Sequence, residues 1–308
     1  MKVNYSVSSA SHASKRQAKP DYELSESARR NSVMSHFADY QGKSEKSPYI
    51  KDAANPVLLK RDSILKATSD VDHQKEIRKG LAFTAQQYDK LDLPGKVSSK
   101  QASNGPHAKY KISDDGSMLI VSKCREVACT ALEATAMLWD HREETALKIW
   151  KDLIDHVDVV AEVSPLQRIM YLRYAQPKVG CSGKTSARDT AIIASKFDVS
   201  NSFADGLPIK DGQIISCSAI TTSLIPVSSQ YVRSDTKVLG FLVTPLTKNS
   251  CSITLVAEFG MQGAFKSPIT QVFLRCTGMN KLAAQVCAED CASGLQRLKE
   301  ALEASAGP

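Results

Sequence analysis

The order of short motifs between residues 186 and 302 decides the fold of this chain. They read, in order, Ser186-Ala187-Arg188-Asp189-Thr190, Ser223-Leu224-Ile225-Pro226, Tyr231-Val232-Arg233 and Gly240-Phe241-Leu242-Val243-Thr244-Pro245. The first opens an apolar segment with strand composition, the second closes another, and the third leads directly into the fourth. A further strand-like segment and a long amphipathic segment ending at Leu302 follow, so several strands and a final helix are expected.

The C-terminal segment predicts one long helix with a single apolar stripe. It opens at Met279-Asn280, and apolar residues then recur at spacings of three and four: Cys287, Cys291, Leu295, Leu298 and Leu302, with Leu282 and Val286 beside them. A helix with one apolar stripe needs a large apolar partner. The concave face of an antiparallel sheet is the candidate partner in this chain.

Strand-like runs fill most of the chain before that helix. We expect strands at residues 96–102, 107–112, 117–122, 156–163, 167–175, 189–197, 213–225, 231–244 and 251–259. Turn signals such as Asp114-Asp115-Gly116 indicate antiparallel hairpins. Residues 126–152, which include Trp139 and Trp150, are typical of helix with a break near Asp140. No helical pattern separates the later strands, which excludes a doubly wound parallel sheet and gives an α+β class.

The polar N-terminal part of the chain is expected to lie outside the folded domain. Residues 1–50 hold eleven serines, and residues 1–100 hold 18 Lys and Arg against 12 Asp and Glu, so most of the net charge of +7 lies there. Such a composition buries too little apolar surface to fold. We therefore expect a mostly disordered tail over 1–68 and one domain over 69–308, opened by a helix with Ile77, Leu81, Ala85 and Tyr88 on one face.

The tail carries one candidate modification site. Arg29-Arg30-Asn31-Ser32-Val33 matches the pattern favoured by basophilic kinases, so Ser32 is a candidate phosphorylation site. The alternative is an unmodified, solvated pair of arginines.

Composition and spacing exclude several classes of function. The eight cysteines lie in apolar patterns without a Cys-x-x-Cys pair, which favours free buried thiols, a reducing cytoplasmic location and no metal site. No Gly-x-Ser-x-Gly or His-Glu-x-x-His motif is present, and residues 180–185 lack the spacing of a phosphate loop, so neither an enzyme nor a cofactor is expected. No apolar stretch approaches about 18 residues. The basic excess lies in a mixed-charge tail, which argues against nucleic-acid binding.

The motif order resembles the StAR-related lipid transfer (START) domain family over about residues 70–308. That family has a strand-opening Arg-Asp, a later Val-Arg, an apolar strand ending at Pro, and a final strand, crossover and helix. The resemblance implies a helix-grip fold, a curved antiparallel sheet wrapped around the long C-terminal helix. It also implies a cytoplasmic monomer, peripheral to membranes, that binds one sterol, phospholipid, ceramide or fatty acid without catalysis and transfers it through transient membrane contacts. A filled helix-grip interaction or regulatory module without a lipid ligand is the alternative.

The resemblance also assigns candidate site residues. The candidate lipid-binding residues are Arg188, Asp189, Thr222, Arg233, Phe241, Leu282 and Val286. Small residues such as Ser216, Ser218 and Gly240 would leave room for a ligand if they face inward, although Arg188, Asp189 and Arg233 could equally form a structural ion pair. The loop at 176–186 matches the family's gating loop; Gly180 and Gly183 would give it freedom, and Lys178 and Lys184 could meet anionic headgroups. In the crossover before the last helix, Gly260 stands where members of the family commonly carry an acidic residue.

Overall fold

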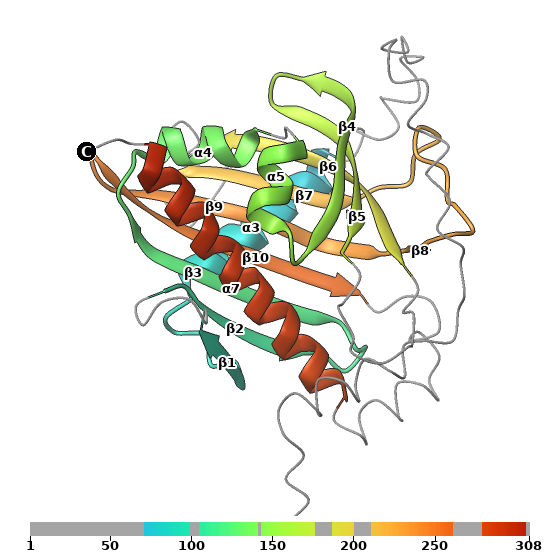
Figure 1. Ribbon diagram of the computed structural model, residues 1–308, viewed down its shortest axis with the longest axis horizontal. Helices are drawn as coiled ribbons and strands as arrows, with labels where there is room; N and C mark the ends of the chain where they lie inside the picture. Colours follow the sequence, from blue (N-terminus) through green and yellow to red (C-terminus); the bar gives the residue numbers. More distant parts are fainter. Residues whose placement is uncertain are drawn as a thin grey trace, which may run out of the picture.

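The computed structural model describes residues 71–98, 105–140, 143–175, 187–199, 211–260 and 279–305 (Figure 1). The expected tail, with Ser32, lies outside these residues. The predicted gating loop, with Lys178, Gly180, Gly183 and Lys184, also lies outside them.

Four described helices and a ten-stranded sheet make up the fold. The helices are α3 (Val71–Gln86), α4 (Ala131–Trp139), α5 (Glu143–Trp150) and α7 (Met279–Ser305). The strands are β1 (Gly95–Ser98), β2 (His107–Ile112), β3 (Met118–Val127), β4 (Ile154–Ser164), β5 (Gln167–Tyr174), β6 (Arg188–Asp198), β7 (Gln213–Ala219), β8 (Val232–Arg233), β9 (Asp235–Thr247) and β10 (Ser250–Gly260). The order across the sheet is β1-β2-β3-β10-β9-β7-β6-β5-β4, all antiparallel, and β8 pairs in parallel with β6.

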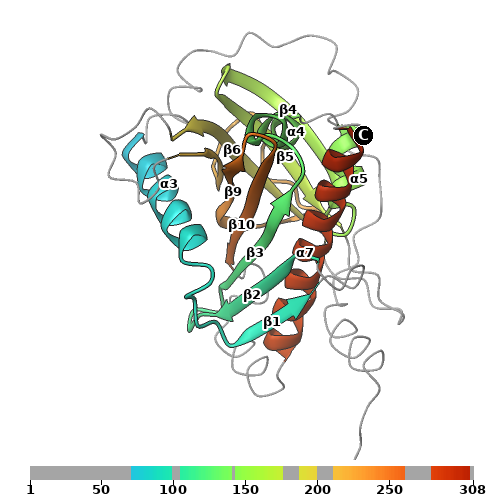
Figure 2. The same ribbon diagram turned by 90° about the vertical axis from the view of Figure 1, so that its left-hand side faces the viewer.

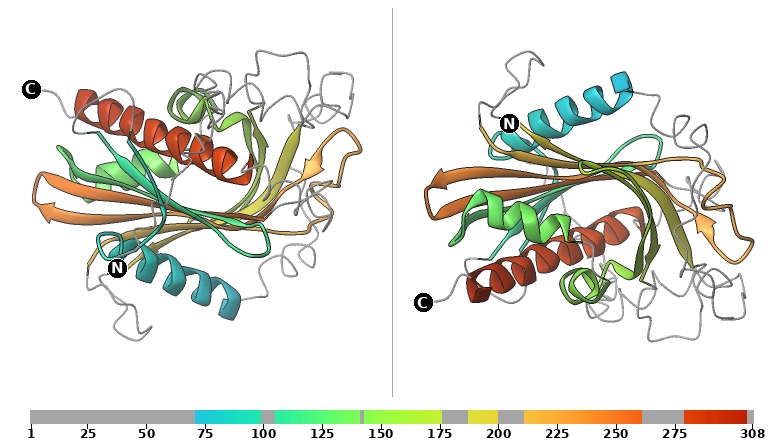
Figure 3. Two further views of the ribbon diagram at one scale, coloured as in Figure 1. Left: turned by 90° about the horizontal axis from the view of Figure 1, so that it is seen from below. Right: turned by 90° about the horizontal axis from the view of Figure 1, so that it is seen from above.

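The sheet curves around α7, which confirms the helix-grip class (Figures 1 and 3). The predicted apolar stripe of α7 faces the sheet, and Cys291, Leu295, Leu298 and Leu302 are each at most 1% exposed. These side chains join inward residues of β3, β7 and β10 in one core. The residues that recur at spacings of three and four therefore form the face of α7 that packs against the sheet.

The convex face of the sheet is covered by α3 (Figure 2). Leu81 and Tyr88 are buried there with Val121 of β3 and Ile214 of β7. Gly240 of β9 also faces α3, because a Cβ atom at that position would lie 2.1 Å from Leu81 Cδ1. The helix expected over Ile77, Leu81 and Ala85 is confirmed, and it packs on the side opposite α7.

The small residues of β7 and β9 make room for α3 and not for a ligand. Ser216 is the register partner of Gly240, so both side-chain positions lie on one face of the sheet, the convex face. The expectation that these residues widen a cavity on the concave face is wrong. Side chains alternate between the two faces of a strand, and Ile215 and Phe241 point into the concave cavity. Their neighbours Ser216 and Gly240 must therefore face the convex side.

Two short helices, α4 and α5, lie beside α7 on the concave side (Figure 3). The predicted break falls at Asp140, the residue that caps the C-terminus of α4, and Thr130 and Glu133 form a capping box at its start. Arg168 of β5 donates to the Trp139 carbonyl at 3.0 Å. Arg297 of α7 donates to the Ile149 carbonyl at 2.7 Å. Cations thus satisfy a terminal carbonyl of each short helix.

Strand β7 is shorter than expected. A strand over 213–225 was predicted, but β7 ends at Ala219. The chain turns at Thr222, whose hydroxyl accepts from the Leu224 amide at 3.3 Å, while its carbonyl accepts from the Ile225 amide at 3.4 Å. A local turn built by a threonine side chain competes with the ladder at this point.

The described cysteines are free thiols, as expected, namely Cys124, Cys129, Cys217, Cys251, Cys287 and Cys291. Within the described ranges no group of His, Cys, Asp and Glu could hold a metal ion. None of the described helices has the length and apolar character that a membrane span requires.

Two helix glycines test the packing of α7 against α5. A Cβ at Gly294 would lie 2.4 Å from the Trp150 ring, whereas a Cβ at Gly80 of α3 meets nothing within 4 Å. We expect Gly80→Ala to raise the free energy of unfolding by about 0.5 to 1 kcal/mol through helix propensity. Gly294→Ala should instead lower it by about 1 to 3 kcal/mol, because the ring must shift. Urea denaturation measures both, and equal effects would contradict the close α5 to α7 contact.

Candidate ligand cavity

A cavity of about 120 Å³ lies between the concave face of the sheet and the helices α4, α5 and α7. Its helix side is formed by Leu138, Ala146, Ile149, Trp150, Cys291 and Leu298. On the sheet side, side chains of β4, β5, β6, β7, β9 and β10 line it. The lining is overwhelmingly apolar, which suits the hydrocarbon part of a ligand.

Strand periodicity places the sheet residues of this cavity. On β5 the lining residues are Met170, Leu172 and Tyr174, which alternate with residues that face away. Ile215 and Cys217 of β7 follow the same rule. Because successive side chains of a strand point to opposite faces, each strand contributes every second residue.

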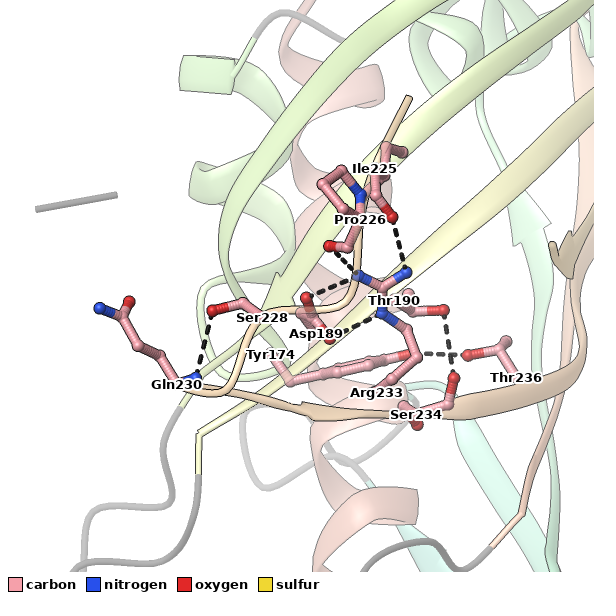
Figure 4. Close-up of polar contacts among 10 residues, drawn as sticks. All are labelled: Tyr174, Asp189, Thr190, Ile225, Pro226, Ser228, Gln230, Arg233, Ser234 and Thr236. Atoms are coloured by element: carbon pink, nitrogen blue, oxygen red, sulfur yellow. Dashed lines mark hydrogen bonds and ion pairs between the residues drawn. The ribbon is translucent and has the colours of Figure 1, made fainter. Parts of the chain in front are cut away.

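One end of the cavity is polar. The Tyr174 hydroxyl lies 2.8 Å from Thr236 Oγ1 (Figure 4). The Tyr174 ring lies edge-on to Phe259 with 6.1 Å between the ring centroids. Burial raises the pKa of Tyr174 to about 12, so the phenol stays protonated at neutral pH. A neutral phenol and a neutral hydroxyl can donate to or accept from a ligand's polar group.

Arg188 lies beside this polar end. It is the register partner of Tyr174, so both side chains lie on the concave face. Burial lowers the pKa of the Arg188 guanidinium, and Cys287 and Tyr174 are its electrostatic neighbours. The structure thus holds a desolvated cation next to the two hydroxyls, at the end of an apolar cavity.

Asp189 faces the opposite side of the sheet from Arg188. It is 2% exposed and accepts two hydrogen bonds from Arg233, at 2.9 Å to Nε and 3.1 Å to Nη2 (Figure 4). The same guanidinium donates to the carbonyls of Ile225 at 3.3 Å and Pro226 at 3.2 Å. Asp189 and Arg233 therefore form a structural ion pair that fastens the turn after β7 to the start of β6, which was the alternative interpretation of these residues.

The cysteine thiols of the cavity are poor nucleophiles. Burial raises the pKa of Cys217 to about 12. Burial also raises the pKa of Cys291 well above its ordinary value, and the electrostatic interaction with the neighbouring Cys287 adds to this rise. Since the thiolate is the reactive form, both thiols are unreactive at neutral pH.

The sequence-predicted site residues separate into three groups. Phe241 lines the cavity, packed at 5.5 Å between ring centroids against Trp150, and Arg188 lies beside its polar end. Asp189 and Arg233 pair on the convex face, and Thr222 forms the turn after β7. Leu282 and Val286 lie on α7, partly exposed and outside the cavity lining.

Residues 137–174 supply much of the cavity, and the sequence did not identify them. They include Leu138, Ile149, Trp150, Leu172 and Tyr174. The signal that could have found the strand members is the alternation in Met170-Tyr171-Leu172-Arg173-Tyr174. That alternation defines two faces, and only the pairing with β6 shows which of them is concave.

Several solved structures are similar to this chain. The lipid transfer and protein localization domain of human StarD13 is 15% identical, with a TM-score of 0.47 and coverage of 73% of this chain and 96% of that chain. A STAR-related lipid transfer protein from Xanthomonas axonopodis is 15% identical, with a TM-score of 0.47 and coverage of 68% and 98%. The ZhuI aromatase/cyclase from Streptomyces is 10% identical, with a TM-score of 0.41 and coverage of 62% and 96%.

No protein-family model matches the sequence, and no curated protein matches it significantly. At identities of 10 to 15% the likeness to solved structures concerns the fold. What those proteins bind or catalyse is a property of those proteins.

Proposed function

We propose that this protein binds one hydrophobic lipid in the cavity, without catalysis. The observation that carries the proposal is a mostly apolar cavity with the Tyr174 and Thr236 hydroxyls at one end, between a curved sheet and a layer of helices. The acyl or ring part of the lipid would contact residues such as Leu172, Phe241 and Leu298. Its polar group would meet Tyr174, Thr236 and Arg188.

The cavity volume sets a condition on this function. About 120 Å³ is smaller than the roughly 300 to 1,000 Å³ of typical ligand pockets. A whole lipid therefore requires the surrounding elements to move apart. The short helices α4 and α5 are the natural candidates, because they cover the cavity and end at Trp139 and Trp150 beside loops. Binding would stabilise the opened arrangement.

A non-catalytic role agrees with the chemistry of the lining. Among the described residues that line the cavity, Asp140 is the only carboxylate, so this part of the lining offers no carboxylate pair for acid and base roles. Cys217 and Cys291 remain protonated thiols at neutral pH. The lining thus supports binding better than acyl transfer or hydrolysis.

Transfer between membranes, a transient membrane contact, a monomeric state and a cytoplasmic location remain parts of the same proposal. The free thiols support a reducing location. The loop at 176–186, with Lys178, Gly180, Gly183 and Lys184, stays the sequence-based prediction for the gate. The side chains of Leu282 and Val286 are proposed to contact the lipid only in an opened form.

The alternative is a filled helix-grip module that binds a partner and no lipid, and the small cavity volume favours it. Native mass spectrometry of the purified protein distinguishes the two functions. One co-purifying lipid per chain, or uptake of one sterol, phospholipid, ceramide or fatty acid from vesicles, supports lipid binding. A chain that stays empty with all four classes contradicts it.

A further inference from the structure

The convex face of strands β1 to β3 carries a run of basic side chains. We call the set Lys96, Ser98, His107, Lys109, Lys123 and Arg125 the basic groove. Pairing places Lys96 opposite Lys109, and Ser98, His107 and Lys123 in one row across the three strands. The alternating residues Val97, Ala108, Tyr110 and Cys124 pack into the concave core, so the basic groove lies on the face turned away from the cavity.

The groove is a recess and its walls are held in place. It encloses about 340 Å³ between the three strands and the turn after α3, where Tyr88 and Asp89 form part of its lining. Lys109 Nζ donates to the Tyr88 carbonyl at 2.7 Å and the Leu91 carbonyl at 3.0 Å. The Tyr88 hydroxyl donates to the His107 carbonyl at 2.9 Å. These hydrogen bonds hold the ammonium group of Lys109 and the ring of Tyr88 in place.

The charges of the groove are unbalanced. Among the described residues that line the recess, Asp89 is the one carboxylate, and it lies 2.8 Å from Arg125 and 3.6 Å from the adjacent Lys123. Among the described residues, none forms a hydrogen bond or ion pair with the side chain of Lys96, whose backbone pairs with that of Lys109. Like charges directly opposite on paired strands destabilise a sheet, and Lys96 and Lys109 are such a pair. An anion in the recess would relieve this repulsion.

We propose that the basic groove binds the phosphate group of a phosphomonoester. Three cations, Lys96, Lys109 and Arg125, line the recess with one carboxylate, which leaves two positive charges, and Lys123 lies beside that carboxylate. This balance suits a dianion better than a monoanion. The Arg125 fork and the lysine ammonium groups are donors that phosphate oxygens accept from. The Ser98 hydroxyl lies 3.0 Å from His107 Nδ1 in the same row. Because the groove and the cavity lie on opposite faces of the sheet, this proposal does not depend on the proposed lipid cavity.

Calorimetric titration with glycerol 3-phosphate and flotation with phosphatidylcholine vesicles containing phosphatidic acid test the site and its source. Binding to the soluble phosphate indicates a free phosphorylated ligand, and binding only to the vesicles indicates a lipid headgroup. Lys96→Gln with Arg125→Gln should weaken binding at least tenfold. The matched control, Lys151→Gln with Lys281→Gln, removes the same charge at exposed positions elsewhere and should leave binding unchanged.

A further variant gives an effect of opposite sign. Asp89→Asn removes the one carboxylate of the recess, so phosphate affinity should rise several-fold, although the variant loses an ion pair with Arg125. Thermal unfolding of each variant checks that the fold persists. The proposal is overturned if neither probe binds, if the control variant loses as much affinity as the groove variant, or if Asp89→Asn weakens binding.

Discussion

Asp189→Asn should lower the free energy of unfolding by about 3 to 5 kcal/mol, because it leaves the Arg233 guanidinium without its charge partner in a largely buried site. Asp189 is 2% exposed, and the Arg233 side chain is 20% exposed. The variant keeps the shape of the side chain and removes the charge, so a change in urea midpoint reports the ion pair itself. Arg233→Met should have a similar effect, since it leaves the Asp189 carboxylate buried alone.

The double variant Asp189→Asn with Arg233→Met identifies the coupling. Its destabilisation should be well below the sum of the two single effects, because neither partner is then left unpaired. Glu76→Gln, at the exposed pair with Lys79 on α3, is the matched control and should change stability by less than about 1 kcal/mol. Additive effects of Asp189→Asn and Arg233→Met would contradict a structural ion pair.

The fold could be predicted because its signals are local and periodic. The stripe of α7 shows at spacings of three and four, and Asp114-Asp115-Gly116 marks the hairpin between β2 and β3. The Arg188-Asp189 motif marks the start of a strand, and β6 begins at Arg188. Each of these signals needs only neighbouring residues, and none requires knowledge of what packs against them.

The site could not be predicted to the same degree, because cavity residues depend on register and on which face of each strand is concave. Small residues at 216 and 240 indicated space, yet the space is occupied by Leu81 of α3. Adjacent residues Arg188 and Asp189 were assigned to one site, but alternation sends them to opposite faces. A one-residue change of register would reverse both assignments, and the sequence alone does not fix it.

Ala146→Trp should abolish lipid binding while the protein stays folded. Ala146 lies on α5 and lines the cavity, so an indole there would fill a space of about 120 Å³ and block its enlargement. Overpacking of this kind costs about 1 to 3 kcal/mol, which a folded domain tolerates. Native mass spectrometry should show no bound lipid, and uptake from vesicles should fall below detection.

The matched control is Lys148→Trp, on the same helix at an exposed position. It adds the same ring without entering the cavity, so lipid binding should persist. Retention of lipid by the folded Ala146→Trp variant would contradict this cavity as the binding site and move the ligand elsewhere on the protein. If the wild-type chain carries no lipid and Ala146→Trp becomes more stable, the added ring has filled an unused void. A filled helix-grip module would then describe the protein better than a lipid carrier, because a ligand cavity is maintained at a cost in packing that only its ligand offsets.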